Sequence, residues 1–366
     1  MIQYLKLGSL TRIRTGKLDA NAADDNGTYP FFTCSREPLS INTCSYDCEC
    51  VLVAGNGDLN VKYYDGKFDA YQRTYIIESL DKTKLMVKYL YYFLDLYVEI
   101  LRQQAIGGVI KYIKLGNLAD AIIPVPVIEK QREIIEIFEK CNGTIAYRQQ
   151  ELLLMDQLVK SRFIEMFGDP KLNPRKWDMV TIGDIATDVR YGTSRPATEG
   201  GKYPYLRMNN LTYEGYLDLT DLKHIDIPDN EIEKCVVRNG DVLFNRTNSV
   251  ELVGKTCVYN LDSDMIIAGY IIRVRIDDRV LPVILSSYLN STVMKEQLRS
   301  MAKGAVNQAN INAQELRSIS IYLPPITLQH KFATFVEQVD KSKFEIQQSL
   351  EKLEILKKSL MQQYFG

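Results

Sequence analysis

Two stretches of the chain decide the fold: PVIEKQREIIEIFEKCNGTIAYRQQELLLMDQLVKSRFIEMFG at Pro126–Gly168, and PPITLQHKFATFVEQVDKSKFEIQQSLEKLEILKKSLMQQYFG at Pro324–Gly366. Adding 198 to a residue number maps the first stretch onto the second without a gap, and twelve of the 43 aligned positions are identical. In the first copy these identities are Pro126, Ile128, Gln131, Glu139, Gln149, Gln150, Leu152, Leu158, Lys160, Ser161, Phe167 and Gly168. A repeat of this length indicates an internal duplication, and it sets the architecture of the chain.

Each copy predicts one long helix. Residues at alternating spacings of four and three, from Ile134 to Met166 and from Phe332 to Tyr364, are apolar at eight of ten positions in each copy. A period of 3.5 residues sustained over more than four heptads is typical of a coiled-coil seam. The polar seam positions are all basic: Arg148, Arg162, Lys343 and Lys357. Because long basic side chains can reach solvent from a seam, we interpret these four as register marks rather than as a functional site.

The duplication extends into the segments that precede the two helices. The strand-and-turn pattern at Tyr4–Leu10 returns at Trp177–Ile185, and the Tyr-Pro-aromatic pattern at 29–31 returns at 203–205. In each segment β-rich runs precede one helix, expected near 83–104 and 283–301, so both segments are predicted to be α+β. The predicted divisions are a first domain at 1–125, a first long helix at 126–168, a linker at 169–176, a second domain at 177–323 and a second long helix at 324–366.

The short linker fixes the direction of the helices. Residues 169–176 hold two prolines, which stop the first helix and turn the chain into the second domain. A helix of about 39 residues is about 58 Å long, which exceeds one turn of B-DNA, about 34 Å. The predicted fold is therefore α+β: two α+β domains in an internal pseudo-two-fold repeat, separated by two long antiparallel coiled-coil helices.

Composition restricts the class of protein. The chain is 46% hydrophobic and 25% charged with a net charge of −1, as in soluble globular proteins. Its apolar runs are too short to span a bilayer, and Met1–Lys17 lacks the apolar centre of a signal peptide. Seven cysteines without a pairing framework favour a reducing cytoplasm.

Four of these cysteines lie within 17 residues, at Cys34, Cys44, Cys48 and Cys50. Four thiolates can hold zinc, but this spacing lacks the paired C-x2-C pattern of structural zinc sites. The sequence therefore favours ordinary thiols and predicts no metal site, although it does not decide the question.

The duplicated motifs resemble a known family. They are the turn glycines Gly8 and Gly183, the run Asn239-Gly240-Asp241-Val242-Leu243, the helix entries Pro126-x4-Gln131 and Pro324-x4-Gln329, and the Phe-Gly helix ends. In these features the whole chain resembles the specificity subunit of a type I restriction–modification system. The first domain is shorter between its landmarks than the second, so residue roles transfer to it less directly.

The resemblance implies that two target-recognition domains each read one half of a split, asymmetric site in double-stranded DNA. It implies that the helices set the spacer and dock two modification subunits, which use S-adenosylmethionine to methylate adenine at N6. It leaves open whether two restriction subunits also bind and add ATP- and Mg-dependent cleavage. We expect no cofactor bound by this chain itself.

The sequence predicts no catalysis by the chain alone. An adenine methyltransferase needs an Asp- or Asn-Pro-Pro-aromatic motif, and the sole Pro-Pro, at 324–325, lies between Leu323 and Ile326. The two histidines, His224 and His330, are far apart in sequence and give little support to a His-based triad.

Base reading needs Arg, Lys, Asn or Gln at a base edge, with basic or hydroxyl groups on nearby phosphates. Turn-rich segments of the second domain have this composition, and we predict DNA contacts at Arg190, Thr193, Ser194, Arg195, Arg207, Asn209, Asn210, Asn245, Arg246, Thr247, Asn248, Lys303, Asn307, Gln308 and Asn310. Corresponding segments of the first domain predict contacts at Arg12, Arg14, Lys17, Gln72, Arg73 and Lys111. A polar loop is more often simply solvated, so these positions depend on the resemblance.

Two alternatives share parts of this pattern. A specificity module for a type IIB-like or orphan methyltransferase would have the same architecture, and neighbouring reading frames would distinguish it. A scaffold whose coiled coil holds two protein-binding heads would show no salt-dependent DNA binding.

Overall fold

The computed structural model describes residues 2–305 and 308–366 and divides into two compact units. Unit 1 comprises Met1–Gln149 and Gln347–Gly366, and unit 2 comprises Gln150–Ile346. The divisions fall inside two helices of 40 residues each, α4 (Ile128–Phe167) and α10 (Ile326–Phe365). Each unit therefore contains one globular α+β part and half of each long helix, whereas the sequence treated the helices as separate segments.

Unit 1 is built on a six-stranded sheet in the order β2-β7-β5-β6-β3-β4. Helix α2 packs on β5 and β6, and the buried core joins Val51, Ile77 and Phe93 to Phe138 of α4. The strands of the unit are β1 (Gln3–Lys6), β2 (Thr11–Thr15), β3 (Tyr29–Phe32), β4 (Leu39–Ile41), β5 (Tyr46–Ala54), β6 (Val61–Ala70), β7 (Thr74–Ser79) and β8 (Ile122–Val125). Its short helices are α1 (Leu7–Leu10), η1 (Ala20–Ala22), α2 (Val87–Gln104) and α3 (Leu115–Ala119).

Unit 2 divides the corresponding strands between two four-stranded sheets, β10-β18-β14-β16 and β12-β11-β17-β13. Its strands are β9 (Asp178–Thr181), β10 (Ala186–Tyr191), β11 (Tyr203–Leu206), β12 (Lys223–Ile225), β13 (Val236–Val237), β14 (Val242–Asn245), β15 (Thr247–Asn248), β16 (Thr256–Val258), β17 (Met265–Ile267), β18 (Ile271–Ile276), β19 (Lys303–Ala305), β20 (Gln308–Asn310) and β21 (Ser320–Leu323). Its helices are α5 (Ile182–Ile185), η2 (Met208–Asn210), α6 (Asp229–Cys235), α7 (Pro282–Asn290), α8 (Thr292–Met301) and α9 (Ala313–Arg317).

The two units share part of their strand pairing. The Tyr-Pro strands β3 and β11 each pair in parallel with a later strand, Phe31 opposite Asp69 in unit 1 and Tyr205 opposite Ile266 in unit 2. In unit 1, β7 pairs with β2, the strand that follows α1. In unit 2, the equivalent strand β18 pairs with β10, which follows α5. The predicted α+β fold and its internal repeat are therefore confirmed.

Gly8 and Gly183, the equivalent glycines of the two repeats, allow short helices to pack closely in each unit. Helix α1 contacts α3, and a Cβ added to Gly8 would lie 3.0 Å from the Cβ of Ala119. In unit 2, α5 contacts α9, and a Cβ on Gly183 would lie 3.2 Å from the carbonyl oxygen of Arg317. A larger residue at either position would push these short helices apart.

One buried glutamine fastens the start of each long helix. Gln131 is fully buried; its Nε2 donates to the carbonyls of Lys84 and Pro126, and its Oε1 accepts from the N–H of Met86. The equivalent Gln329 is also fully buried. It donates to the carbonyls of Arg279 and Pro324 and accepts from the N–H of Leu281. The Pro-x4-Gln motif thus joins each long helix to the turn that starts α2 or α7.

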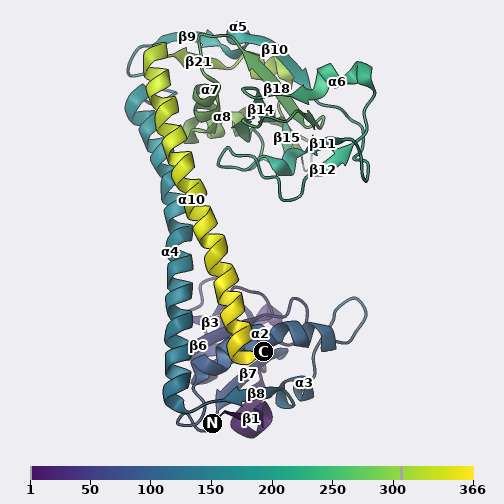
Figure 1. The fold of residues 1–366 in the computed structure, drawn as a ribbon, viewed down its shortest axis with the longest axis vertical. Helices are drawn as coiled ribbons and strands as arrows, with labels where there is room; N and C mark the ends of the chain where they lie inside the picture. The colour runs from purple at the N-terminus through teal and green to yellow at the C-terminus, as the bar shows by residue number, and fades with distance from the viewer. Residues whose placement is uncertain (1, 306–307) are drawn as a thin grey trace. The chain divides into compact units, whose positions relative to one another are not determined.

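Aromatic rings hold the two long helices together within each unit, where they lie side by side and antiparallel (Figure 1). In unit 1, Phe365 of α10 stacks on Phe138 of α4 with centroids 6.0 Å apart. In unit 2, Phe332 of α10 meets both Phe163 and Phe167 of α4 at 5.5 Å. The identical Phe-Gly ends of the two repeats therefore close equivalent clusters.

Two of the basic seam residues, Lys343 and Arg162, have identified partners. Lys343 Nζ lies 2.5 Å from Asp156 Oδ1 across the helix pair, and both side chains are less than one-fifth exposed. Arg162 pairs with Glu165 and lies over the ring of Phe335. A largely buried cross-helix ion pair penalises a shift of one helix along the other, so Lys343 suits a register mark, although it pairs inside the helix pair instead of reaching solvent.

We predict that Gln131→Ala and Gln329→Ala each destabilise their own unit by about 3 kcal/mol, because each leaves two carbonyls and one N–H without a partner inside the protein. Chemical denaturation followed by circular dichroism measures this loss. Gln149→Ala, an exposed glutamine of the same helix, is the control and should change stability by less than about 0.5 kcal/mol. Equal effects at Gln131 and Gln149 would contradict the role of the buried amide.

Candidate nucleic-acid interface

Four predicted contact residues of unit 1 meet at one end of its sheet. The N–H of Lys17 bonds the carbonyl of Ala70, and the N–H of Gln72 bonds the carbonyl of Leu18. The carbonyl of Arg73 accepts from Gly55, whose own carbonyl accepts from Ile113. These bonds gather Lys17, Gln72, Arg73 and the loop carrying Lys111, and we call this end of the sheet the unit 1 strand-end surface.

The side chains of this surface are available for a ligand. Lys17, Gln72, Arg73 and Lys111 are all exposed. Within the part of unit 1 that the structure describes, none of the three cations forms an ion pair with a carboxylate. Cations without carboxylate partners can neutralise phosphates without first breaking a bond.

The other two predicted contacts of unit 1 lie elsewhere. Arg14 pairs with Glu78 at 2.8 Å and lies over the ring of Tyr46, so its guanidinium is engaged within the sheet. Arg12 is exposed near the start of β2, whereas the strand-end surface lies beyond the end of that strand. A DNA contact by Arg12 or Arg14 therefore needs a different surface from the one that gathers Lys17 and Arg73.

The equivalent end of unit 2 is formed by the loop after β14. The N–H of Arg246 bonds the carbonyl of Tyr270, and the carbonyl of Arg246 accepts from Ile311. Thr247 pairs with Asn310 in the β15–β20 ladder, and its hydroxyl donates to the Asn310 amide oxygen at 2.9 Å. The N–H of Gly269 bonds the carbonyl of Thr193. We call this region, with Arg246 at its centre, the unit 2 strand-end surface.

Arg246 is held in position by two neighbours. Its guanidinium lies 4.9 Å from the centroid of the Tyr191 ring, and one terminal nitrogen donates to the carbonyl of Gly269 at 3.3 Å. The Tyr191 hydroxyl in turn accepts from the N–H of Ala313. An arginine stacked on an aromatic ring, with donors left over, can present a fixed edge to a base or a phosphate.

Several predicted residues of unit 2 serve the fold in this structure. Asn245 is fully buried, and its amide donates to the carbonyls of Thr247 and Tyr270 and accepts from Asn248. Asn210 is buried, bonding the N–H of Arg207 and the carbonyl of Asp218. We assign both amides to positioning the loops; no observation here tests a direct DNA contact by them.

Three predicted arginines of unit 2 already have carboxylate partners: Arg190 with Asp188, Arg195 with Glu231, and Arg207 with Asp221, each at 2.7 Å. A DNA phosphate would compete with these carboxylates, which makes the three weaker candidates than Arg246.

The remaining predicted positions differ in their exposure to solvent. Ser194 and Asn209 are exposed, whereas Thr193 and Thr247 are buried. Asn307 lies outside the described residues, and the side chains of Lys303 and Gln308 are not described either. No direct contact between any of the predicted residues and DNA has been tested, so all of them remain predictions.

The sequence missed two aromatic residues of the unit 2 surface. Tyr191 and Tyr270 are 41% and 50% exposed, and neither is among the predicted contact residues. Both lie at strand ends next to a glycine, Gly192 or Gly269, and this placement was the available signal.

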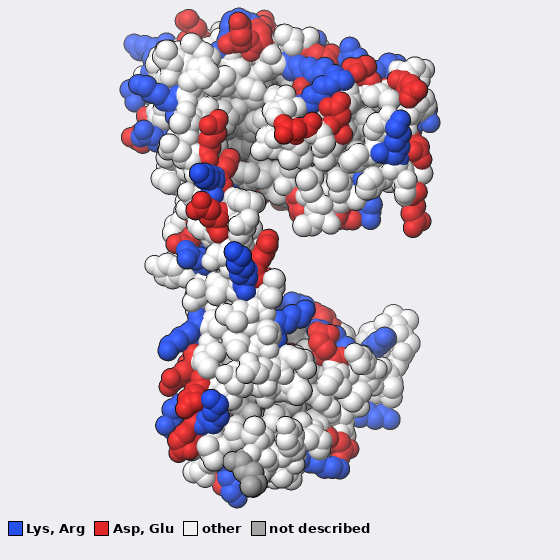
Figure 2. Space-filling model, in the orientation of Figure 1, with Lys and Arg blue, Asp and Glu red and all other residues white. Residues whose placement is uncertain are grey.

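Charges of both signs are mixed over the visible face of the molecule, and basic side chains do not gather into one large patch there (Figure 2). This agrees with the net charge of −1. Any attraction for nucleic acid must therefore come from local groups such as the unpaired cations of the unit 1 surface.

A buried lysine lies behind the unit 2 surface. Lys295 of α8 is 3% exposed, and its Nζ donates to the carbonyl of Gly254 at 2.7 Å. The N–H of Gly254 bonds Asn245, so the lysine supports the loop that ends beside Arg246. Burial, with smaller contributions from nearby cations, lowers the pKa of Lys295 to about 7.

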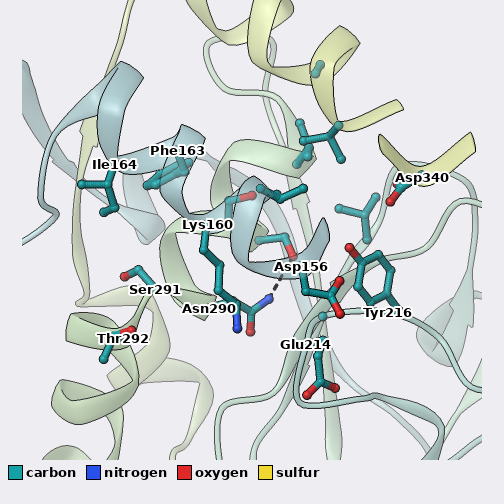
Figure 3. Close-up of a pocket in the computed structure, with 18 of the residues that line it drawn as sticks. Asp156, Lys160, Phe163, Ile164, Glu214, Tyr216, Asn290, Ser291, Thr292 and Asp340 are labelled. Carbon is teal, nitrogen blue, oxygen red and sulfur yellow. Dashed lines mark hydrogen bonds between the residues drawn. The ribbon is translucent and has the colours of Figure 1, made fainter. Parts of the chain in front are cut away.

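Unit 2 also contains a cavity of about 420 Å³ between its segments of α4 and α10, the turn at 214–217 and the α7–α8 junction. Figure 3 shows its polar lining, which includes Asp156, Lys160, Glu214, Tyr216, Asn290 and Asp340. Burial raises the pKa of Asp340, and one oxygen of its carboxyl group has no partner. Carboxylates outnumber cations around the cavity, so it would repel phosphates and is not part of the candidate interface.

The described residues contain no group of three or more His, Cys, Asp or Glu side chains placed to hold a metal ion. Cys48 and Cys50 both lie on β5, where burial raises the pKa of each thiol. Among the described helices, none combines the length and apolar character needed to cross a membrane.

The fold and its surfaces define a class: a duplicated protein whose two units carry different side chains at equivalent strand ends. The family described as "Type I restriction modification DNA specificity domain" matches residues 2–154 and 174–357. The chain therefore belongs to this family, and its resemblance to type I specificity subunits is confirmed.

Individual relatives agree with this assignment. The chain is 37% identical over 156 residues to the type I restriction enzyme EcoDI specificity subunit of Escherichia coli, covering 43% of this chain and 34% of that protein. It is 29% identical over 196 residues to the putative MjaX specificity subunit of Methanocaldococcus jannaschii, covering 52% of this chain and 46% of that protein. These matches span only a third to a half of the relatives' own length.

Solved structures share the fold. A type I restriction–modification S subunit from M. genitalium superimposes with a TM-score of 0.59 at 16% identity, covering 100% of this chain and 96% of that chain. A second structure comes from work on the structural basis of complex assembly and conformational transition of the type I R-M system. It superimposes with a TM-score of 0.60 at 17% identity, covering 100% of this chain and 97% of that chain.

We predict that Lys295 makes the stability of unit 2 depend on pH. Its folded pKa lies below its unfolded value, so between about pH 7 and 10 the unfolded chain binds a proton that the folded chain does not. Wild-type stability should therefore rise with pH across this interval relative to Lys295→Met, which cannot titrate.

The fluorescence of Trp177, the sole tryptophan and a residue of unit 2, reports this unfolding in urea at pH 7, 8 and 9. Lys171→Met, at an exposed lysine, is the matched control and should remain parallel to wild type. A Lys295→Met profile that is also parallel to wild type would show that the lysine titrates normally.

Proposed function

We propose that the chain is the DNA sequence-recognition subunit of a type I restriction–modification complex. In this proposal the two strand-end surfaces each read one half of a bipartite site in double-stranded DNA. The observation that carries the proposal is the equivalence of the two surfaces: the same strand ends form them, but different side chains occupy them.

The different side chains account for an asymmetric site. The unit 1 surface offers Lys17, Gln72, Arg73 and Lys111, which suit phosphates and base edges. The unit 2 surface offers Arg246 on Tyr191 with hydroxyl and amide groups around it. A repeated scaffold with unlike surfaces would read two unlike half-sites.

The long helices would set the spacer between the half-sites. Each has 40 residues and is therefore about 60 Å long. The aromatic clusters and the Lys343–Asp156 pair fix how the helices lie along each other in each unit. Helix length then becomes the variable that determines the spacer.

The same helices would dock two modification subunits, which would use S-adenosylmethionine to methylate adenine at N6. Leu158 and Leu356 are identical residues of the two repeats, and both are about half exposed. Equivalent exposed leucines suit two copies of one apolar partner surface. The acidic cavity beside α4 would suit a basic side chain of such a partner. The chain would contribute recognition rather than catalysis, and cleavage would need restriction subunits with ATP and Mg.

Two alternatives remain distinct from this proposal. With an orphan or type IIB-like methyltransferase, the chain would use the same surfaces to read DNA. Only the partner protein that acts on the DNA would differ. A scaffold that binds only proteins would give no sequence-specific and no salt-dependent DNA binding.

We predict that Arg246→Ala weakens the binding of the complex with its modification subunits about tenfold or more, because one well-placed arginine contact is worth about 1–3 kcal/mol. Selection of duplexes from a randomised library should give a bipartite site for wild type, with specificity lost at one half-site alone in the variant.

The matched control is Arg238→Ala, an exposed arginine of unit 2 that pairs with Glu233 and Asp264. It should bind and select like wild type. If Arg246→Ala also selects the wild-type site with unchanged affinity, Arg246 does not contact DNA; if the wild-type complex selects no sequence, the recognition role itself is wrong.

We predict that seven residues inserted after Ile145 and after the equivalent Lys343 lengthen the spacer while leaving both half-sites unchanged. Two turns add about 10 Å, or about three base pairs, and a heptad keeps the seam in phase. Library selection with the insertion variant measures the new spacing. An unchanged spacer would contradict the role of the helices, and altered half-sites would contradict the independence of the two surfaces.

A further inference from the structure

A tight hairpin leads away from the unit 1 strand-end surface. Ile106 and Tyr112 exchange two backbone hydrogen bonds of 3.0 and 2.9 Å, so the chain reverses between them. Gly107 has φ +124°, and a Cβ there would lie 2.6 Å from the carbonyl oxygen of Ile110. A glycine is therefore needed at this turn, and the hairpin has a defined shape rather than being an open loop.

The base of the hairpin is bonded to the sheet. The N–H of Gly57 bonds the carbonyl of Lys111, and the N–H of Ile113 bonds the carbonyl of Gly55. The Tyr75 hydroxyl donates to the carbonyl of Ile113 at 3.2 Å. Figure 1 shows the connection between α2 and α3, which contains this hairpin, extending outward from unit 1. The base of the hairpin is thus held at a fixed place, and Gly55 joins it to Arg73.

The tip of the hairpin is apolar and uncovered. Val109 is 104% exposed and Ile110 is 62% exposed, and Ile106 below them is 46% exposed. Neither tip side chain can form a hydrogen bond, so neither can read the polar edge of a base. Two adjacent apolar side chains that project into solvent from a rigid hairpin indicate a contact surface.

The corresponding positions of the second repeat carry different residue types in the sequence. The Ile113–Gly55 bond has its counterpart in the bond from the N–H of Ile311 to the carbonyl of Arg246, and 113 and 311 differ by the repeat offset of 198. By that offset Val109 and Ile110 correspond in sequence to Asn307 and Gln308. One repeat therefore carries an apolar pair where the other carries two amides.

We propose that the 106–112 hairpin of unit 1 is a wedge that inserts Val109 and Ile110 between base pairs and opens one base step of its half-site. The inference rests on the proposed function, because it needs unit 1 to lie on DNA. The cations Lys111 and Arg73, which have no carboxylate partner among the described residues, would hold the flanking phosphates. Apolar side chains used in this way unstack and kink a duplex. Recognition at this step would then depend on how easily the sequence deforms.

The experiment uses the chain in complex with its modification subunits and a duplex that the wild-type complex has selected from a randomised library. 2-Aminopurine replaces single bases through both half-sites, since its fluorescence rises when it is unstacked. The test variant is Val109→Ser with Ile110→Ser, and Val109→Leu with Ile110→Leu is the apolar rescue. The matched control is Leu80→Ser, at a 63%-exposed leucine beyond the opposite end of β7.

Methyltransferases flip their target base out of the stack, so the modification subunits enhance 2-aminopurine fluorescence at the target adenines. Wild type should give a further enhancement at one other step of one half-site. The serine variant should lose this enhancement and bind about tenfold more weakly, while the leucine variant and Leu80→Ser should retain both properties. Unchanged fluorescence and affinity in the serine variant would overturn the wedge while leaving the proposed function intact. A serine variant that fails to assemble with modification subunits would also overturn it, because the hairpin would then bind protein. A wild-type complex that selects no sequence would instead overturn the proposed function.

Discussion

The buried amide at the start of each long helix is the constraint on which the rest of the structure depends. Gln131 and Gln329 each satisfy three backbone groups: two in the turn before α2 or α7, and the carbonyl of the proline that precedes the long helix. The same bonds, made twice, fix the direction in which each long helix leaves its globular part. The aromatic clusters that end at Phe167 and Phe365 then close the opposite helix against it.

This arrangement separates what must stay constant from what can diverge. The repeated residues serve the helices and their anchors, while the strand ends that form the candidate interface carry different groups in the two units. Arg246 on Tyr191 has no counterpart in unit 1, where Gly55 accepts the equivalent backbone bond. The apolar Val109–Ile110 pair likewise has no counterpart in unit 2. A scaffold that repeats itself can therefore present two unrelated surfaces without altering its core.

The sequence predicted the elements whose signal is periodic or repeated. The 198-residue offset and the 3.5-residue period predicted both long helices, because burial on one stripe constrains many positions at once. The candidate site was only partly predictable, since composition shows which side chains can bond but not which partner they find. Asn245 and Arg14 looked available in sequence and are engaged by neighbours that are distant along the chain, whereas Asn210 is engaged within its own turn. Tyr191 was overlooked because its residue type alone does not separate an exposed tyrosine from a core tyrosine; only its place at a strand end before Gly192 does.

The central claim is that one chain with two unlike recognition surfaces determines a bipartite DNA site. Mapping of N6-methyladenine across the genome, with and without the gene for this chain, tests it most directly. The account predicts one methylated motif with two different halves and a fixed spacer, present with the gene and lost on its deletion. A methylation pattern that does not change on deletion in cells that express the chain and its modification subunits would contradict the claim.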